Sequence, residues 1–596
     1  MDNSRKLFKD LNVSNDVTRS GFDLSHDVKW TSKCGELIPL MHRTMMFGDK
    51  AKLRVTGKSR TIPVVSPAFT RINEYFDFFF VPYRLLGKQL PNVLAQNVDN
   101  PSVASSATTD RLIGNRLPWV NFFDLVGSSS SVLQSLKDKK NTFGFNRAVL
   151  SSKLMNQLGY CYNDLDNMRA LNGEDDYTYK MLWQLNPNVS ILPFMAYQKI
   201  YYDFFRNTQW EDNKPYNYNV DYLNANGAFV IPSSTNSAYW DNPTMFDLRY
   251  ANYPRDLFFG LLPDSQDGDP ATVDIDFSSS LNGTASLYDL DKGTQVGVGS
   301  VNNAPNANIK AIDGSTINPQ DTLGIYTSGV ISQLKGSFSI LDERKSRFMQ
   351  KYKEIMGSGK KDYQNIVRKV FGVEIPDDLA DHCTYIGGHQ QIVNIGEIDN
   401  TNLSANNSAI QRGKGLGTSS SDYFEFEAKE PGVIMCIYHC APAIDYALNA
   451  FHFDVTKTHV DDFANPVFDK LGFQEFPVYY LDNSLNHNIN STPFIGYTSR
   501  YFDYKTSVDM ILGDFRESKK SFVAPLTPEY LIEFNSQDGS NYGFDLNSQF
   551  FKVNPKILDV IFNIQANDYV NTDQLYSSVR FEFHAVRNLD YIGLPY

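Results

Sequence analysis

The alternation of apolar and polar positions predicts strands near both ends of the chain. In Asp49–Val55 the cations Lys50, Lys52 and Arg54 alternate with apolar residues, a period of two that places all three cations on one face of a strand. Glu74–Val81 is apolar on both faces, which is typical of a strand buried on both sides. Two more strands are predicted in the last third, at Val433–Tyr438 and Arg580–Val586.

Helical spacing appears in the long stretches between these strands. Apolar residues at helical spacing predict helices over Phe194–Asn207 and Phe338–Met356. A shorter helix, Tyr363–Phe371, is expected to end at Gly372. Strands at both ends of the chain, separated by long mixed loops, favour a mainly β protein with helical loop insertions, built as an antiparallel sandwich of jelly-roll type.

Changes in amino-acid composition along the chain suggest where its domains begin and end. Residues 1–35 are polar with scattered apolar anchors and are expected to form an extended N-terminal arm. Residues 263–332 are rich in Asp, Asn, Gly, Ser and Thr, which surround short runs typical of β-strands. This composition indicates an inserted, surface-exposed subdomain. The remainder, 36–262 and 333–596, is expected to form one discontinuous core with helix-containing loops.

Composition and charge narrow the function classes. The formal net charge is −13, whereas a protein whose main task is to hold a phosphate backbone carries a basic surplus. Any nucleic-acid contact must therefore be local or made by a separate basic partner. The 42 Phe and 34 Tyr are typical of a chain that buries surface against neighbours, and the aromatic-rich loops are the expected seams.

Five cysteines, an odd number and mostly far apart, do not form a disulfide framework. The polar N-terminus lacks a signal peptide, and no run approaches the roughly 18 apolar residues of a membrane span. The chain is therefore expected to fold in a reducing cytoplasm without contact to a membrane.

Short motifs that could carry chemistry each have a simpler interpretation. A metal cluster at Cys436, His439 and Cys440 is weighed against buried thiols, and a nucleophile–base pair among His382, Cys383 and His389 against a structural turn. Gly413–Thr418 lacks P-loop spacing and is interpreted as a flexible glycine loop. Asp461-Asp462 could bind a divalent cation but is more typical of a solvated turn or cap. We therefore expect no catalytic residue, no metal and no cofactor.

The best candidates for local phosphate contact are Lys50, Lys52 and Arg54, with Lys58 and Arg60 just beyond them. The alternative is a plain solvated strand face, since exposed cations are the default on any wet surface.

Several segments, in the same order and spread over more than 400 residues, resemble the major capsid protein of gokushovirus-like microviruses. Met195 stands where that family has Arg, and several motifs are looser than the gokushovirus forms, which favours a sister group such as that of phages of gut Bacteroidetes. The segments that carry the resemblance include Phe22–Ser25, Gly35–Pro39, Tyr75–Tyr83, Leu192–Tyr201, Arg255–Phe259, Tyr385–Gly388 and Gly496–Tyr501.

The resemblance implies a single eight-stranded antiparallel jelly roll, the β-barrel of viral capsids, whose copies close a T=1 icosahedral shell around circular single-stranded DNA. It also implies a small basic DNA-binding virion protein, a DNA pilot or minor capsid protein, and assembly in the bacterial cytoplasm. The 263–332 segment would form a protrusion at the threefold axis that meets a host receptor. Candidate positions for that contact are Asp267, Asp291, Ala307 and Asp321.

One alternative class remains open at this point. The Tyr and Trp content and the exposed acids also fit a carbohydrate-binding or glycan-degrading β-protein, in which two carboxylates at a defined separation would act.

Overall fold

The structure, a computed structural model, describes residues 18–95, 117–126, 131–160, 187–222, 231–232, 236–272, 276–278, 285–289, 291, 294–299, 308–311, 323–327, 335–337, 340–376, 379–399, 411–447, 450–481, 494–526, 546–562 and 573–591. The chain divides into two compact units. The core unit comprises Met1–Ser265 and Gly359–Tyr596, and the second unit, called the 266–358 unit, comprises Gln266–Ser358.

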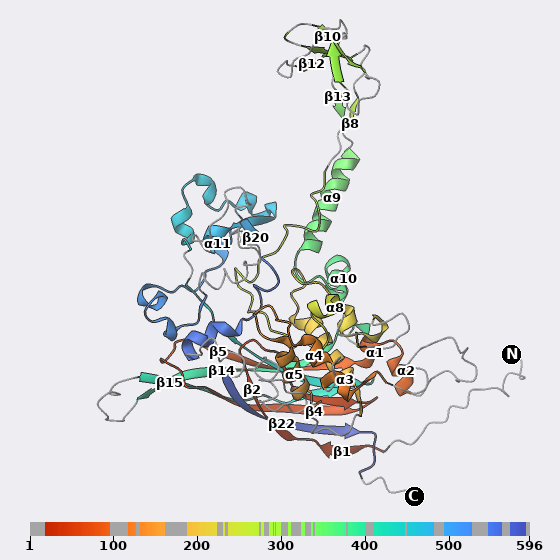
Figure 1. The fold of residues 1–596 in the computed structure, drawn as a ribbon, viewed down its shortest axis with the longest axis vertical. Helices are drawn as coiled ribbons and strands as arrows, with labels where there is room; N and C mark the ends of the chain where they lie inside the picture. The colour runs from red at the N-terminus through yellow and green to blue at the C-terminus, as the bar shows by residue number, and fades with distance from the viewer. Residues whose placement is uncertain are drawn as a thin grey trace, which may run out of the picture. The chain divides into compact units, whose positions relative to one another are not determined.

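Within the described residues of the core unit, ten strands form one antiparallel sheet in the order β1-β22-β4-β15-β14-β5-β17-β3, with β16 paired to β4 and β2 to β22 (Figure 1). The last long strand, β22, lies between the first strands and β4, so the two ends of the chain meet in the sheet. The strands are β1 (Ser20–Asp23), β2 (His26–Ser32), β3 (Ile38–Met45), β4 (Lys50–Thr61), β5 (Ile72–Pro82), β14 (Thr384–Asp399), β15 (Gln411–Ser420), β16 (Phe424–Glu427), β17 (Gly432–Pro442) and β22 (Leu575–Arg587).

The burial of these strands follows the sequence pattern. In β4 the apolar residues Ala51, Leu53 and Val55 are buried and the residues between them face outward, which confirms the predicted alternation. Every residue of β5 is buried or half-buried, and so is every residue of β17. Strands buried on both faces carry few polar side chains, as the sequence indicated.

The sheet curls so that its two halves face each other. The rings of Phe78 in β5 and Phe581 in β22 lie 6.1 Å apart, and those of Trp30 in β2 and Tyr438 in β17 lie 5.0 Å apart, although neither pair of strands is adjacent in the sheet. The hydrophobic core therefore fills the space inside the curl. The protein is mainly β, as predicted, with one large curled antiparallel sheet (Figure 1).

Helices and short strand pairs occupy the loops between the sheet strands. Most buried residues of the sheet and of these loops form one core, and Ala447, Ile511 and Val523 form a small second cluster. The predicted helices are confirmed: α7 begins at Leu192 and continues as a π-helical turn, Tyr201–Phe205, and α10 ends at Gly372, whose φ of 68° suits glycine. The described helices of the core unit are α1 (Tyr83–Leu86), α2 (Leu90–Leu94), α3 (Phe122–Val126), α4 (Val132–Leu136), α5 (Arg147–Gln157), α7 (Leu192–Ile200), α8 (Ser237–Asp241), α10 (Tyr363–Phe371), α11 (Phe502–Lys505) and α13 (Asp559–Phe562). The strand pairs are β6 (Trp119–Asn121) with β7 (Asn188–Ser190), β18 (Asp445–Tyr446) with β21 (Pro525–Leu526), and β19 (Phe473–Pro477) with β20 (Phe494–Ser499).

The interpretation of Gly413–Thr418 as a flexible loop is wrong, because these residues lie in β15 and pair with β4 and β14. The glycines serve close packing. A Cβ on Gly415 would lie 2.5 Å from the Thr61 methyl carbon, and one on Gly413 would lie 2.6 Å from a Val64 methyl carbon. Larger residues would push β15 away from its neighbours.

The 266–358 unit has its own strands and one long helix. Its four-stranded sheet has the order β11 (Asn308–Ala311), β10 (Thr294–Gly299), β9 (Ala285–Asp289) and β12 (Leu323–Thr327), and β8 (Asp276–Ser278) pairs with β13 (Lys335–Ser337). The helix α9 (Ile340–Gly357) confirms the predicted helix. The backbone N–H of Asp267 donates to the Lys353 carbonyl at 3.1 Å, so the chain enters and leaves this unit at adjacent points.

Candidate functional surfaces

The outward face of β4 carries the three cations that the sequence singled out, and the structure brings them together in one row. Each is paired with a carboxylate on a neighbouring strand, and ion pairs this exposed contribute at most about 1 kcal/mol to stability. The face is therefore a mixed-charge surface rather than a purely basic one. The pairs are Lys50–Glu427 at 3.2 Å, Lys52–Glu425 at 3.0 Å and Arg54–Glu582 at 3.7 Å.

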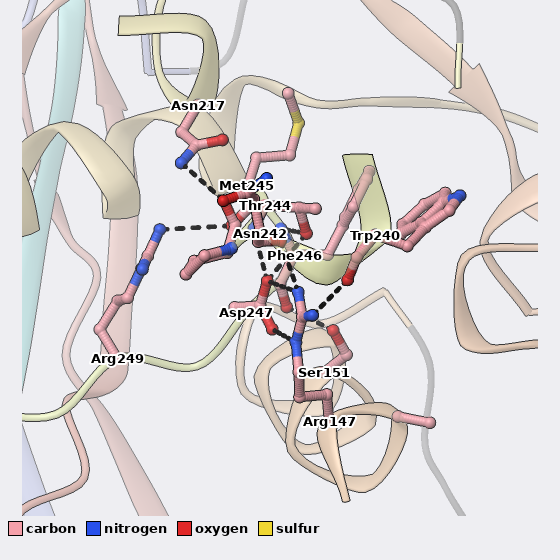
Figure 2. A network of polar contacts seen from close by, with 12 residues as sticks. Arg147, Ser151, Asn217, Trp240, Asn242, Thr244, Met245, Phe246, Asp247 and Arg249 are labelled. Atoms are coloured by element: carbon pink, nitrogen blue, oxygen red, sulfur yellow. Dashed lines mark hydrogen bonds and ion pairs between the residues drawn. The ribbon is translucent and has the colours of Figure 1, made fainter. Parts of the chain in front are cut away.

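A buried ion pair joins the loop after α8, which contains Asp247, to the start of helix α5 (Figure 2). Arg147, at the start of α5, donates to both carboxylate oxygens of Asp247 at 2.7 Å, and also to the carbonyls of Trp240 and Asn242. Burial alone would raise the pKa of Asp247, but the hydrogen bonds and charge of Arg147 hold that pKa below its usual value. The backbone N–H of Thr244 donates to the same carboxylate at 2.6 Å. This network is structural, because its charges satisfy one another.

A cavity of about 560 Å³ beside this network is lined by further charged side chains. Lys552 pairs with Glu211 at 3.2 Å and donates to the Tyr201 hydroxyl at 2.8 Å, while Arg249 donates to Gln198 at 2.8 Å. Burial lowers the pKa of Lys552, and the lysine's charge in turn helps to keep the pKa of Glu211 low despite burial. Mutual pairing of this kind is what buried charges require for stability.

The short motifs that were considered as chemical sites lie within the packed structure. Cys436 and Cys440 are buried in β17, where burial raises the pKa of the Cys436 thiol, and His439 stacks on Tyr75 with ring centroids 4.8 Å apart. Across the described residues there is no group of three His, Cys, Asp or Glu side chains placed to hold a metal ion.

The remaining two motifs are also packing elements. The backbone N–H of Cys383 donates to Asp203 at 2.8 Å. Gly387-Gly388 are paired with β5 within β14, directly after an irregularity between Tyr385 and Gly387, rather than in the turn that was expected. The Asp462 carboxylate accepts from the backbone N–H groups of Thr458 and His459 at 2.7 Å, which confirms its interpretation as a cap.

Comparison with known proteins decides the class of this molecule. The sequence profile of a phage family described as "Capsid protein (F protein)" matches residues 12–122 and 171–595, which is most of the chain. The chain belongs to this capsid protein family.

Individual relatives agree with the profile. The chain is 23% identical to capsid protein VP1 of Bdellovibrio phage phiMH2K, over 97% of this chain and 95% of the relative. It is 22% identical to capsid protein VP1 of Chlamydia phage 1, over 84% and 85%, and 21% identical to that of Spiroplasma virus 4, over 65% and 62%. The resemblance to microvirus major capsid proteins is thus confirmed.

This capsid protein is a structural component of a phage virion and not an enzyme, so the glycan-degrading alternative is wrong. In the part of the chain that the structure describes, no helix is both long and apolar enough to cross a membrane.

A capsid protein buries surface against its own copies, and one segment exposes much apolar surface. We call residues 450–472 the apolar segment; it consists largely of the 3₁₀ turns Phe453–Thr456, Val460–Asp462 and Pro466–Leu471. Val460 and Val467 are 88% and 80% exposed. Contiguous exposed apolar surface marks interaction sites. The other exposed apolar residues of the segment are Phe451, Val455, Phe463, Phe468 and Leu471.

Sequence reasoning expected contacts in aromatic-rich loops but did not locate this segment. The signal was present, since apolar residues recur there without the period of a strand or a helix. Such a run has no internal face on which to bury its side chains.

The candidate host-contact residues lie in the 266–358 unit. Asp267 and Asp291 are exposed. Ala307 and Asp321 lie outside the described residues.

Proposed function

We propose that this capsid protein self-assembles into a closed T=1 icosahedral shell that encloses a circular single-stranded DNA genome. The observation that carries the proposal is family membership over most of the chain, since capsid proteins act by self-association. The curled antiparallel sheet and the exposed apolar segment support it, because a shell needs both a rigid subunit and surfaces by which subunits contact one another.

We also propose that the sheet is a single eight-stranded jelly roll. Of the ten described strands of this sheet, β1 and β16 are short, with four residues each, and the remaining eight would form the barrel. The aromatic contacts between β5 and β22 and between β17 and β2 support this arrangement, because the facing halves of a jelly roll pack in this way.

The apolar segment is proposed to be a seam between copies. Replacing Val460 and Val467 by Asp places two charges in a surface that must lose water on assembly. We expect the double variant to fold normally, since both side chains are exposed, and to remain as monomers or small oligomers in sedimentation.

The matched control is Val460→Ile with Val467→Ile, which keeps the surface apolar and should assemble. If the Asp variant forms closed particles as readily as this control, the apolar segment is not a seam.

The genome is proposed to meet the shell at a few local contacts and through separate partners, because the chain carries a net charge of −13. Lys50, Lys52 and Arg54 are the sequence-based candidates for phosphate contact, but each is paired with a carboxylate, so we expect them to contribute little to DNA binding unless that carboxylate is displaced. A small basic DNA-binding protein would supply most of the positive charge, and a DNA pilot or minor capsid protein would complete the virion.

The 266–358 unit is proposed to form the protrusion at the threefold axis and to contact the host receptor. Its separate packing and its adjacent entry and exit points support this proposal, since they are typical of a unit inserted into a complete core.

A further inference from the structure

The outward face of the sheet divides into two parts that differ in their ion pairs. At one end of β4, Lys50, Lys52 and Arg54 are held by carboxylates. At the other end lie Lys58 and Arg60, both exposed. Among the described residues, neither of these two cations forms an ion pair within 4.0 Å, and nor does Lys29 on β2. On this face of the sheet, the cations at one end are therefore neutralised by carboxylates and, within the described residues, those at the other end are not.

The strand register gathers the unpaired cations around one aromatic ring. Lys58 in β4 lies opposite Ser578 in β22, which in turn lies opposite Lys29 in β2. One step along the same face, Arg60 lies opposite Tyr576. Neighbouring strands are about 4.8 Å apart, so the two lysines stand about 10 Å apart on either side of β22.

These residues line an open depression of about 520 Å³. We call it the basic depression, and the side chains that matter are Lys29, Thr31, Lys58, Arg60, Tyr576 and Ser578. None of the described residues that line it is acidic. Tyr576 is 48% exposed, so part of its ring is open to a ligand.

One carboxylate, Asp573, lies at the edge of this surface, where it accepts a hydrogen bond from the Thr31 hydroxyl. It also pairs with Lys153 at 3.0 Å, a lysine that it shares with Glu36, and Lys33 lies close enough to act on it as a second positive charge. The basic depression therefore keeps an excess of positive charge in a chain whose net charge is −13.

We propose that the basic depression binds single-stranded nucleic acid, with Lys29, Lys58 and Arg60 on phosphates and Tyr576 stacked on a base. Cations beside an exposed aromatic ring are the arrangement by which proteins hold single strands without reading their sequence. The hydroxyl of Ser578 adds a further group that can donate to a phosphate oxygen. The inference rests on the proposed function and names the surface of the shell protein that meets the genome.

The test compares two triple variants of the full-length protein that remove the same charge from the same face of the sheet. Lys29→Gln, Lys58→Gln, Arg60→Gln changes the basic depression, and Lys50→Gln, Lys52→Gln, Arg54→Gln changes the paired end. The probe is a labelled oligodeoxythymidylate, whose affinity is measured over a range of salt concentrations. Each phosphate contact on a single strand adds about 0.7 to the log–log salt slope, so the first variant should lose about 2 from the slope. The second variant should leave the slope unchanged.

Two further variants distinguish the contribution of charge to nucleic-acid binding from that of base stacking and from a change in folding. Tyr576→Thr keeps a strand-forming residue but removes the ring, and it should weaken binding by a factor of about 5 to 150 without changing the slope. Lys29→Arg with Lys58→Arg retains both charges and should keep the slope of the unaltered protein. Loss of binding in this charge-conserving variant would mean that the depression is disrupted rather than discharged, and would overturn the proposal.

Particle formation by each variant is followed by sedimentation, with nucleic-acid content read from absorbance. The proposal predicts that the basic-depression variant forms particles that retain less nucleic acid. If that variant no longer forms particles, the depression contacts a neighbouring subunit instead and the proposal is wrong. It is also wrong if the paired-end variant loses as much slope. Failure of the unaltered protein to form particles would contradict the proposed function, while oligonucleotide binding would still decide this inference.

Discussion

Asp77, in the buried strand β5, illustrates how single residues respond to burial. Its side chain is 17% exposed, accepts a hydrogen bond from the Tyr385 hydroxyl at 3.1 Å, and lies 3.9 Å from Nδ1 of His439. Burial raises the pKa of Asp77 to about 6 and lowers that of His439 to about 3. Both effects favour the neutral form of each group, as a low-dielectric site requires.

This shift predicts a pH dependence of stability. Because the folded pKa of Asp77 lies above its usual 3.8, the unfolded chain releases the proton first, so stability falls as pH rises from about 4 to about 6. The full shift corresponds to about 3 kcal/mol. Asp77→Asn keeps an acceptor for Tyr385 and removes the charge, so the free energy of unfolding at about pH 7.5 should rise by about 1 to 3 kcal/mol. Urea unfolding at several pH values measures this, and an unchanged pH slope or a loss of stability in the variant would contradict it.

At the scale of elements, strands and helices with regular periods could be predicted from the sequence. The alternation in β4 and the helical spacing in α9 and α10 depend only on nearby residues, and the structure has these elements. β15 was missed because its glycines are required by side chains of β4 and β14, which the local sequence does not reveal. The Arg147–Asp247 pair, 100 residues apart, and the partners of Lys50, Lys52 and Arg54 are likewise set by the tertiary fold. Which cations of the sheet face are neutralised could therefore be learned only from the strand register.

The element-scale prediction concerns the 266–358 unit. Because its entry and exit points are adjacent, a short Gly-Ser linker between Gln266 and Ser358 can replace 267–357 without stretching the core. We expect the shortened protein to fold and to form particles, and these particles to bind host cells less than full-length ones do. Sedimentation and a cell-binding assay measure the two outcomes. Collapse of folding would assign the unit to the core, and unchanged binding would remove its proposed role in attachment.

At the scale of the whole molecule, we propose that the curled β core unit and the 266–358 unit present several surfaces with different partners. The apolar segment is proposed to meet neighbouring copies and the basic depression to meet the genome, and the 266–358 unit is proposed to meet the host. A shell with closed symmetry uses such distinct patches, each repeated around its own axis. On this proposal the acidic net charge has a physical role, since it would leave nucleic-acid contact to a local surface and to separate basic partners.

Electron cryomicroscopy of the full-length protein purified from expressing cells would show whether its copies close into a shell. We expect particles of one size with icosahedral T=1 symmetry, in which the apolar segment lies between subunits. Only monomers and small oligomers, under conditions in which authentic virions persist, would contradict it.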